Sequence, residues 1–270
     1  MIVGAYGNTP VSGANMANRL KENICVGLEY FKALGFDHLP VSRAALELQS
    51  APDEPELPRA PDPVRPVLDK QTALRQLRDE IGDCKRCRLS EERTNIVFGE
   101  GDLDARIMFI GEAPGREEDQ QARPFVGEAG KLLTKLIEKM GEKNGFGRKD
   151  VYIANIVKCR PPMNRDPHDD EMRTCSQFLI RQIEIIQPEV IVSLGRISAF
   201  SLSGRSGALT SFSITRERGK FFEYKAGGRT IPVMPTFHPA YLMRNPKDKW
   251  LTWEDALAVL AKLGLGEKTG

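Results

Sequence analysis

The sequence has little that would place it in a membrane or in an oxidising compartment. No apolar run reaches the roughly 18 residues that a membrane span needs, and the first twenty residues lack the basic start and long apolar core of a secretory signal. The 270 residues include five cysteines, an odd number that argues against a disulfide framework. We therefore expect a cytoplasmic protein with no membrane partner.

Common nucleotide-binding patterns and internal repeats are also missing. The segment GEAPGREED at 111–119 has neither the Gly-Lys-Ser/Thr ending of a P-loop nor the GxGxxG spacing. Charge is nearly balanced, with 39 basic and 37 acidic residues, but residues 1–69 carry a net charge of −3 and residues 70–270 one of +5. The larger part could meet a polyanion, although solvated surface charge explains this excess equally well.

The chain divides into three parts. We predict an N-terminal extension over 1–49, a linker over 50–68 and a main domain over 69–270. The extension contains one amphipathic helix at 17–34, which we expect to bind a protein partner, and translation could start at Met1 or Met16. Six prolines among acidic residues make the linker unsuited to a packed core.

Short apolar runs alternate with amphipathic ones in the main domain. Strands are predicted at 106–110, 151–157, 190–194 and 231–236, and helices at 69–84, 129–140, 169–187, 196–202 and 247–263. This alternation indicates an α/β fold with a parallel sheet covered on both faces. Ligands of such sheets bind beyond the carboxyl ends of the strands, so the candidate segments are 111–115, 155–165, Gly195 and 237–246.

Four cysteines have the spacing of a possible metal site. Cys84 and Cys87 form C-x-x-C, and Cys159 with Cys175 could complete a tetrathiolate centre. Four thiolates suit zinc or an iron-sulfur cluster, and spacing does not choose between them. The alternative is that Cys159 and Cys175 are buried thiols beside a redox-active C-x-x-C.

Side chains after the predicted strands suggest a binding site. Asn155 can present both a donor and an acceptor, which matches the imide edge of a pyrimidine, but many such residues only satisfy backbone groups. Phe125 could stack on a ring or belong to the core. His238 lies in the expected crevice, and Lys158, Arg160 and Arg165 form a basic, proline-stiffened loop suited to phosphates.

Four motifs in order resemble the family 4 uracil-DNA glycosylases, which are iron-sulfur repair enzymes. They are C-x-x-C before GEAPGREED, then RPFVGEAG, then NIVKCRPPMNR with a later Cys, and HPAYLMRNP. The resemblance covers about Leu74 to Leu263. It implies an α/β/α sandwich around a four-stranded, mostly parallel sheet, and a [4Fe-4S] cluster held by Cys84, Cys87, Cys159 and Cys175.

The resemblance also implies the residue roles. Phe125 stacks on an extruded uracil, Asn155 reads its O4 and N3 edge, and Glu118 stands near C5, where a thymine methyl would clash. Glu112 and Ala113 complete the uracil site, and the DNA contacts fall to Arg160, Arg165, Met243 and Arg244. His238 faces O2 of the departing base as a catalytic residue. A neutral His donating there stabilises the uracil anion by about 3 kcal/mol.

Ala113 stands where related families have an Asp, and alanine cannot activate water. A dissociative departure with late capture of water is therefore expected, with Asn164 orienting the water or a phosphate. Ala122 replaces the usual Gly before RPF, and Met243 replaces a Leu but could still wedge into the base stack.

The sequence thus predicts a monomeric, monofunctional enzyme that removes uracil from single- or double-stranded DNA in base excision repair. Rival hypotheses are a non-catalytic or covalent uracil-DNA-binding protein of the same superfamily, and an electron carrier that uses only the cluster.

Overall fold

The computed structural model describes residues 69–265. The predicted extension, its helix at 17–34 and the linker up to residue 68 lie outside the described residues. Within 69–265, no helix has the length and hydropathy that crossing a bilayer would require.

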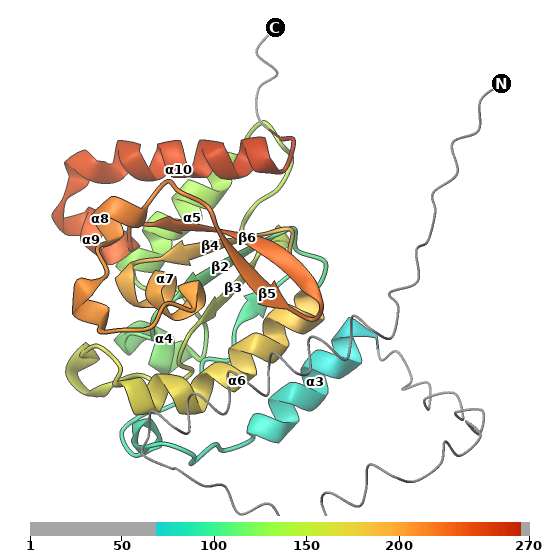
Figure 1. Cartoon of the computed structure of the whole chain (residues 1–270). Helices are drawn as coiled ribbons and strands as arrows, with labels where there is room; N and C mark the ends of the chain where they lie inside the picture. Colours follow the sequence, from blue (N-terminus) through green and yellow to red (C-terminus); the bar gives the residue numbers. More distant parts are fainter. Residues whose placement is uncertain (1–68, 266–270) are drawn as a thin grey trace, which may run out of the picture. The chain divides into compact units, whose positions relative to one another are not determined.

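A mixed six-stranded sheet, in the order β1-β3-β2-β4-β6-β5, forms the centre of the domain (Figure 1). The strands are β1 (Glu100–Gly101), β2 (Ile107–Gly111), β3 (Tyr152–Asn155), β4 (Val190–Leu194), β5 (Phe222–Ala226) and β6 (Arg229–Thr236). The four central strands β3, β2, β4 and β6 are parallel. The edge strands β1 and β5 are antiparallel to their neighbours. The expected four-stranded sheet is therefore this parallel centre, and two edge strands were missed.

Helices cover both faces of the sheet, as expected for a three-layer sandwich (Figure 1). They are α3 (Lys70–Ile81), α4 (Arg116–Gln121), α5 (Glu128–Gly141), α6 (Asp169–Ile186), α7 (Arg196–Ser203), α8 (Ile214–Glu217), α9 (Pro239–Arg244) and α10 (Lys249–Lys262). Short 3₁₀ helices occur at Arg88–Ser90, Arg148–Asp150, Pro162–Asn164, Leu209–Ser211 and Pro246–Asp248. The five predicted helices correspond to α3, α5, α6, α7 and α10.

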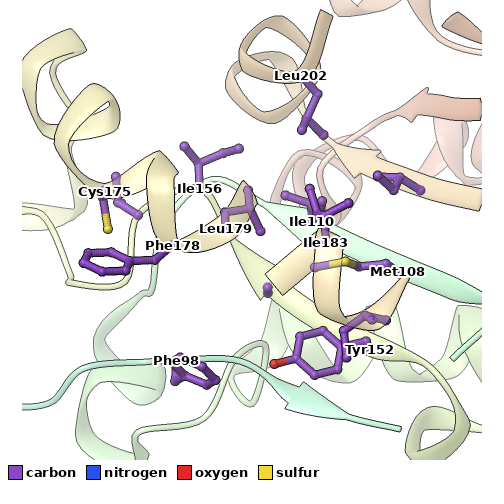
Figure 2. Close-up of a cluster of buried hydrophobic side chains, with 14 of the residues drawn as sticks. Phe98, Met108, Ile110, Tyr152, Ile156, Cys175, Phe178, Leu179, Ile183 and Leu202 are labelled. Carbon is purple, nitrogen blue, oxygen red and sulfur yellow. The ribbon is translucent and has the colours of Figure 1, made fainter. Parts of the chain in front are cut away.

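Alternate residues of the buried strands enter two separate cores. In β2, Met108 and Ile110 join the core under α3, α6 and α7, part of which Figure 2 shows. Ile107 and Phe109 point to the other face and pack with residues of α5 and α10. Strands buried on both faces read as continuous apolar runs, which explains why the sequence predicted these strands correctly.

Candidate functional site

A cavity of about 460 Å³ opens at the carboxyl ends of β2, β3 and β6. Glu112 follows β2, Asn155 ends β3, and His238 lies two residues beyond β6. We call this cavity the uracil pocket, after the ligand that the sequence predicts. Its lining includes the predicted residues Glu112, Ala113, Glu118, Phe125, Asn155, Asn164, Arg165, His238 and Arg244. Its volume lies in the range of about 300–1,000 Å³ that is typical of small-molecule sites.

The side chains of Phe125 and Asn155 lie close together beside Gly111. A Cβ atom on Gly111 would lie 2.4 Å from Asn155 Oδ1 and 2.5 Å from Phe125 Cζ, so only glycine leaves this space. Phe125 has a left-handed φ of 51°, a strained conformation that often marks a functional site. Asn155 is 1% exposed, and its Oδ1 has no hydrogen-bond partner within the described chain. Such an orphaned oxygen beside a cavity suits a ligand that donates to it.

The carboxylate of Glu118 ties together the two segments that form one wall of the pocket. It accepts hydrogen bonds from the backbone N–H groups of Gly115 (3.1 Å), Val126 (2.9 Å) and Gly127 (2.9 Å). The sequence did not indicate that Glu118 holds these two segments in position. Ala122, which replaces the usual glycine nearby, takes the left-handed conformation that a glycine would adopt more easily (φ 55°).

His238 caps the N-terminus of α9 and also lines the uracil pocket. Its Nδ1 accepts a hydrogen bond from the Ala240 N–H (3.2 Å), so the neutral ring holds its hydrogen on Nε2. Burial, together with the charge of Arg244, lowers the pKa of His238 to about 4. The ring lies 5.7 Å from that of Phe125, centroid to centroid. The side chain is therefore a neutral Nε2–H donor at neutral pH.

Glu112 has an unusual carboxyl group. Its pKa is raised to about 7, mainly by burial and also by the charge of Asp166, while Arg196 partly opposes the rise. The sequence predicted Glu112 only as a uracil contact and gave no sign that its carboxyl would titrate near neutral pH. Perturbed carboxyl groups of this kind concentrate at functional sites.

The basic loop after β3 differs in part from its predicted role. Lys158 is 1% exposed, and its ammonium donates to the Asn155 carbonyl (2.9 Å) and to Gln182 Oε1 (2.6 Å). It cannot reach a phosphate, so this part of the prediction was wrong. The pattern of charges showed a basic loop, but only the packing of α6 decides which cation is buried.

The other cations of this loop hold neighbouring groups. Arg160 lies outside the pocket lining and donates from Nε to Asn164 Oδ1 (2.7 Å), which orients Asn164. Arg165 forms two hydrogen bonds with the buried carboxylate of Glu171 (2.8 and 2.6 Å). Met243 lies outside the pocket as well, on α9, and is 46% exposed.

The four predicted ligand cysteines line one small cavity. Cys84 and Cys87 precede and begin the first 3₁₀ helix, Cys159 follows β3 and Cys175 belongs to α6, where Figure 2 shows it at the margin of the core. None of the four forms a disulfide. The Lys158 N–H donates to Cys175 Sγ (3.3 Å), and Arg86 Nη1 donates to Cys84 Sγ (3.2 Å). We call this site the cysteine cavity.

The four cysteines are a donor set that suits a metal centre held by thiolates. Burial raises the pKa of Cys159 to about 12 and also raises the pKa values of Cys87 and Cys175, so the thiols need a metal to ionise them. Within residues 69–265, no group of three His, Cys, Asp or Glu side chains is already arranged to hold a metal ion. Arg93 Nε, buried without a partner, provides a donor beside Cys159.

Comparison with known proteins agrees with this geometry. The model of the uracil DNA glycosylase superfamily matches residues 98–258. A type-4 uracil-DNA glycosylase of Sulfurisphaera tokodaii is 48% identical over 68% of this chain and 81% of its own length. That of Thermotoga maritima is 46% identical over 66% of this chain and 88% of its own. A type-5 uracil-DNA glycosylase of Pyrobaculum aerophilum is 34% identical over 54% of this chain and 66% of its own. The chain belongs to the uracil-DNA glycosylase superfamily, and its relatives place it with the type-4 members.

Proposed function

We propose that this protein hydrolyses the N-glycosidic bond of a uracil flipped out of DNA and leaves an abasic site, as the first step of base excision repair. The observation that carries the proposal is the unpartnered Oδ1 of Asn155, buried at the pocket wall beside Phe125. An enzyme cannot reach this bond inside a duplex, so the base must be extruded and held by stacking and edge contacts.

Recognition requires contacts that uracil makes and other bases do not. The Oδ1 of Asn155 accepts from N3–H of uracil and its Nδ2 donates to O4, whereas cytosine presents a bare N3 and an amino group. Phe125 supplies the stacking surface. Glu118, fixed by three backbone N–H groups, stands on the side of C5 and leaves no room for the methyl group of thymine.

Cleavage leaves the electron pair of the bond on uracil, so the departing base becomes an anion. His238 donates its Nε2–H to O2 of this anion. Because its pKa is about 4, His238 is neutral at physiological pH and does not protonate the base outright. One preorganised donor in a site that excludes water contributes about 3 kcal/mol to the transition state.

Water is captured after the bond breaks. Ala113 provides no base, while Asn164, oriented by Arg160, can hold a water or a phosphate at the pocket mouth. The lining of the uracil pocket includes no lysine, so no amine is placed to attack the sugar. This supports a monofunctional glycosylase without a strand-cutting step.

The cysteine cavity would hold a [4Fe-4S] cluster through Cys84, Cys87, Cys159 and Cys175. When bound, the cluster supplies iron-thiolate links among the C-x-x-C segment, the loop after β3 and α6. Lys158 connects this region with the pocket, because its N–H donates to Cys175 and its ammonium to the carbonyl of Asn155.

The test is an assay on a uracil-containing oligonucleotide, single- and double-stranded, with protein that retains its iron. We expect an alkali-labile site with wild type and none with Asn155→Leu, a change that keeps the size of the side chain and removes its polar edge. An intact oligonucleotide with wild type would refute the function. A protein–DNA adduct that survives denaturation would instead indicate the covalent binder, and reversible reduction without cleavage would indicate the electron carrier.

A further inference from the structure

A second cavity adjoins the uracil pocket and shares the side chain of Phe125 with it. This groove runs between α5 and the segment from Met243 on α9 to Lys249 at the start of α10. Its volume, about 660 Å³, exceeds that of the uracil pocket. A chain that enters the pocket at Phe125 can therefore continue into the groove.

Five cations and two carboxylates line the groove. The cations are Arg123, Lys131, Lys135, Arg148 and Lys249, and the acids are Glu128 and Glu138. Three of the cations are already paired: Arg123 and Arg148 share Glu100, at 2.7 and 2.8 Å, and Lys131 pairs with Glu128. Lys135 and Lys249 are exposed, and neither forms an ion pair between described residues, although the charge of Lys135 also acts on Glu128. These two ammonium groups are available to an anionic ligand.

The groove suits a sugar-phosphate backbone better than bases. Among the described residues that line the groove, Phe125 is the one aromatic side chain and is 6% exposed, so this lining has no platform for a row of stacked bases. Exposed lysines on two elements, one at each side of a groove, are typical contacts to successive phosphates. Met243 also lines the groove and is 46% exposed.

We propose that this groove binds the phosphates that flank the extruded nucleotide on its own strand, with Lys135 and Lys249 as the contacting cations. The inference rests on the proposed function. The strand assignment follows from continuity: the groove begins at the wall of the uracil pocket, and the phosphates nearest to an extruded base belong to the strand that carries it. The complementary strand contributes nothing to these two contacts.

The experiment compares wild type with the double variant Lys135→Ala/Lys249→Ala. Single-turnover cleavage of one uracil oligonucleotide, single-stranded and in duplex, gives the maximal rate and the enzyme concentration for half that rate at several salt concentrations. A matched control, Lys220→Ala/Lys225→Ala, removes the same charge from exposed lysines at the far edge of the sheet, at and just before β5.

We expect the half-saturating concentration of the double variant to rise about tenfold at 0.1 M salt, equally for both substrates. Each lost phosphate contact should lower the slope of log affinity against log salt by about 0.7–0.9, so the two together lower it by roughly 1.5. The maximal rate should stay within about twofold, and the control variant should match wild type.

Two results would overturn the inference while wild type still cleaves uracil. One is a double variant that behaves like the control, which would mean that DNA does not occupy the groove. The other is a loss confined to duplex substrate, which would assign the lysines to the complementary strand. Absence of cleavage by wild type would instead refute the proposed function, so the two failures are distinguishable.

Discussion

The uracil pocket and the cysteine cavity share residues of the loop after β3, but the atoms expected to contact a ligand differ in whether the protein already supplies them with hydrogen bonds. In the pocket, Asn155 Oδ1 is buried without a partner, and Phe125 is held in a strained conformation. In the cysteine cavity, the sulfurs of Cys84 and Cys175 accept hydrogen bonds from the protein itself. A free acceptor at the pocket wall suits a ligand that comes and goes, whereas sulfurs that already accept hydrogen bonds suit the proposed cluster, which would be a permanent part of the fold.

The strongest test of this contrast is to remove one proposed cluster ligand. Cys175→Ser should lack the brown colour expected of the proposed cluster and bind much less iron than wild type, because serine is a poor ligand for iron and Cys175 is buried in α6. We expect the free energy of unfolding to fall by about 4 kcal/mol or more, and the melting temperature by roughly 10 °C. Iron analysis and calorimetry measure both effects.

The control for this change is Cys25→Ser. Cys25 stands outside the four-cysteine set, so iron and melting temperature should match those of wild type. Full iron content in Cys175→Ser would remove this residue from the proposed ligands and would leave the contrast between the two sites without support.

The second test removes the proposed donor from the pocket and leaves the cysteine cavity intact. His238→Ala should lower kcat by about 10²–10³-fold, since the uracil anion loses one preorganised donor, while iron content stays the same. Alanine also removes the acceptor that caps α9. His238→Ser restores a capping oxygen but cannot reach the base, so it should recover stability without recovering rate. Recovery of rate in the serine variant would show that the cap, not the donor, was lost.

The third test concerns the effect of pH on the pocket. The pKa of Glu112 is about 7 in the folded protein, against an ordinary value of 4.5. Between pH 4.5 and pH 7, the carboxyl group is therefore protonated in the folded state and ionised in the unfolded state. Wild type should therefore lose stability as pH rises from about 4.5 to 7, and stay at that lower level above. Glu112→Gln cannot ionise and should escape this loss. At pH 8 we expect the variant to be more stable than wild type by about 1–2 kcal/mol.

Thermal melts of both proteins from pH 4.5 to 8 test whether wild type loses stability as the pH rises. The difference in melting temperature should be smallest at the acid end and grow in favour of Glu112→Gln. A difference that does not vary with pH would mean that the Glu112 carboxyl is as well solvated in the pocket as in the unfolded chain.

The sequence predicted the elements that a local pattern of apolar residues determines. Runs such as VIVSL at 190–194 are apolar on both faces, so β4 was found at its observed bounds. β5 was missed because it is an edge strand in which half-buried and exposed residues alternate and only Ala226 is buried. α4 was missed because six polar residues after GEAPG resemble a loop. Predicting the site required more than the local pattern of residues. Family motifs identified Asn155 and His238, but the burial of Lys158 and the raised pKa of Glu112 depend on elements that pack from elsewhere in the chain.

The smallest expected effect comes from a second buried oxygen without a partner, which lies outside the uracil pocket. Thr252 Oγ1, on α10, is 3% exposed and has no hydrogen bond within residues 69–265. Thr252→Val keeps the shape and removes the unpaired hydroxyl, so it should stabilise the protein by up to about 1 kcal/mol with no change in cleavage rate. Asn155→Leu removes an orphaned oxygen of the same kind, yet should abolish cleavage without lowering the melting temperature. If Thr252→Val destabilised the protein instead, the Thr252 hydroxyl would have a partner, and the two oxygens would not be of the same kind.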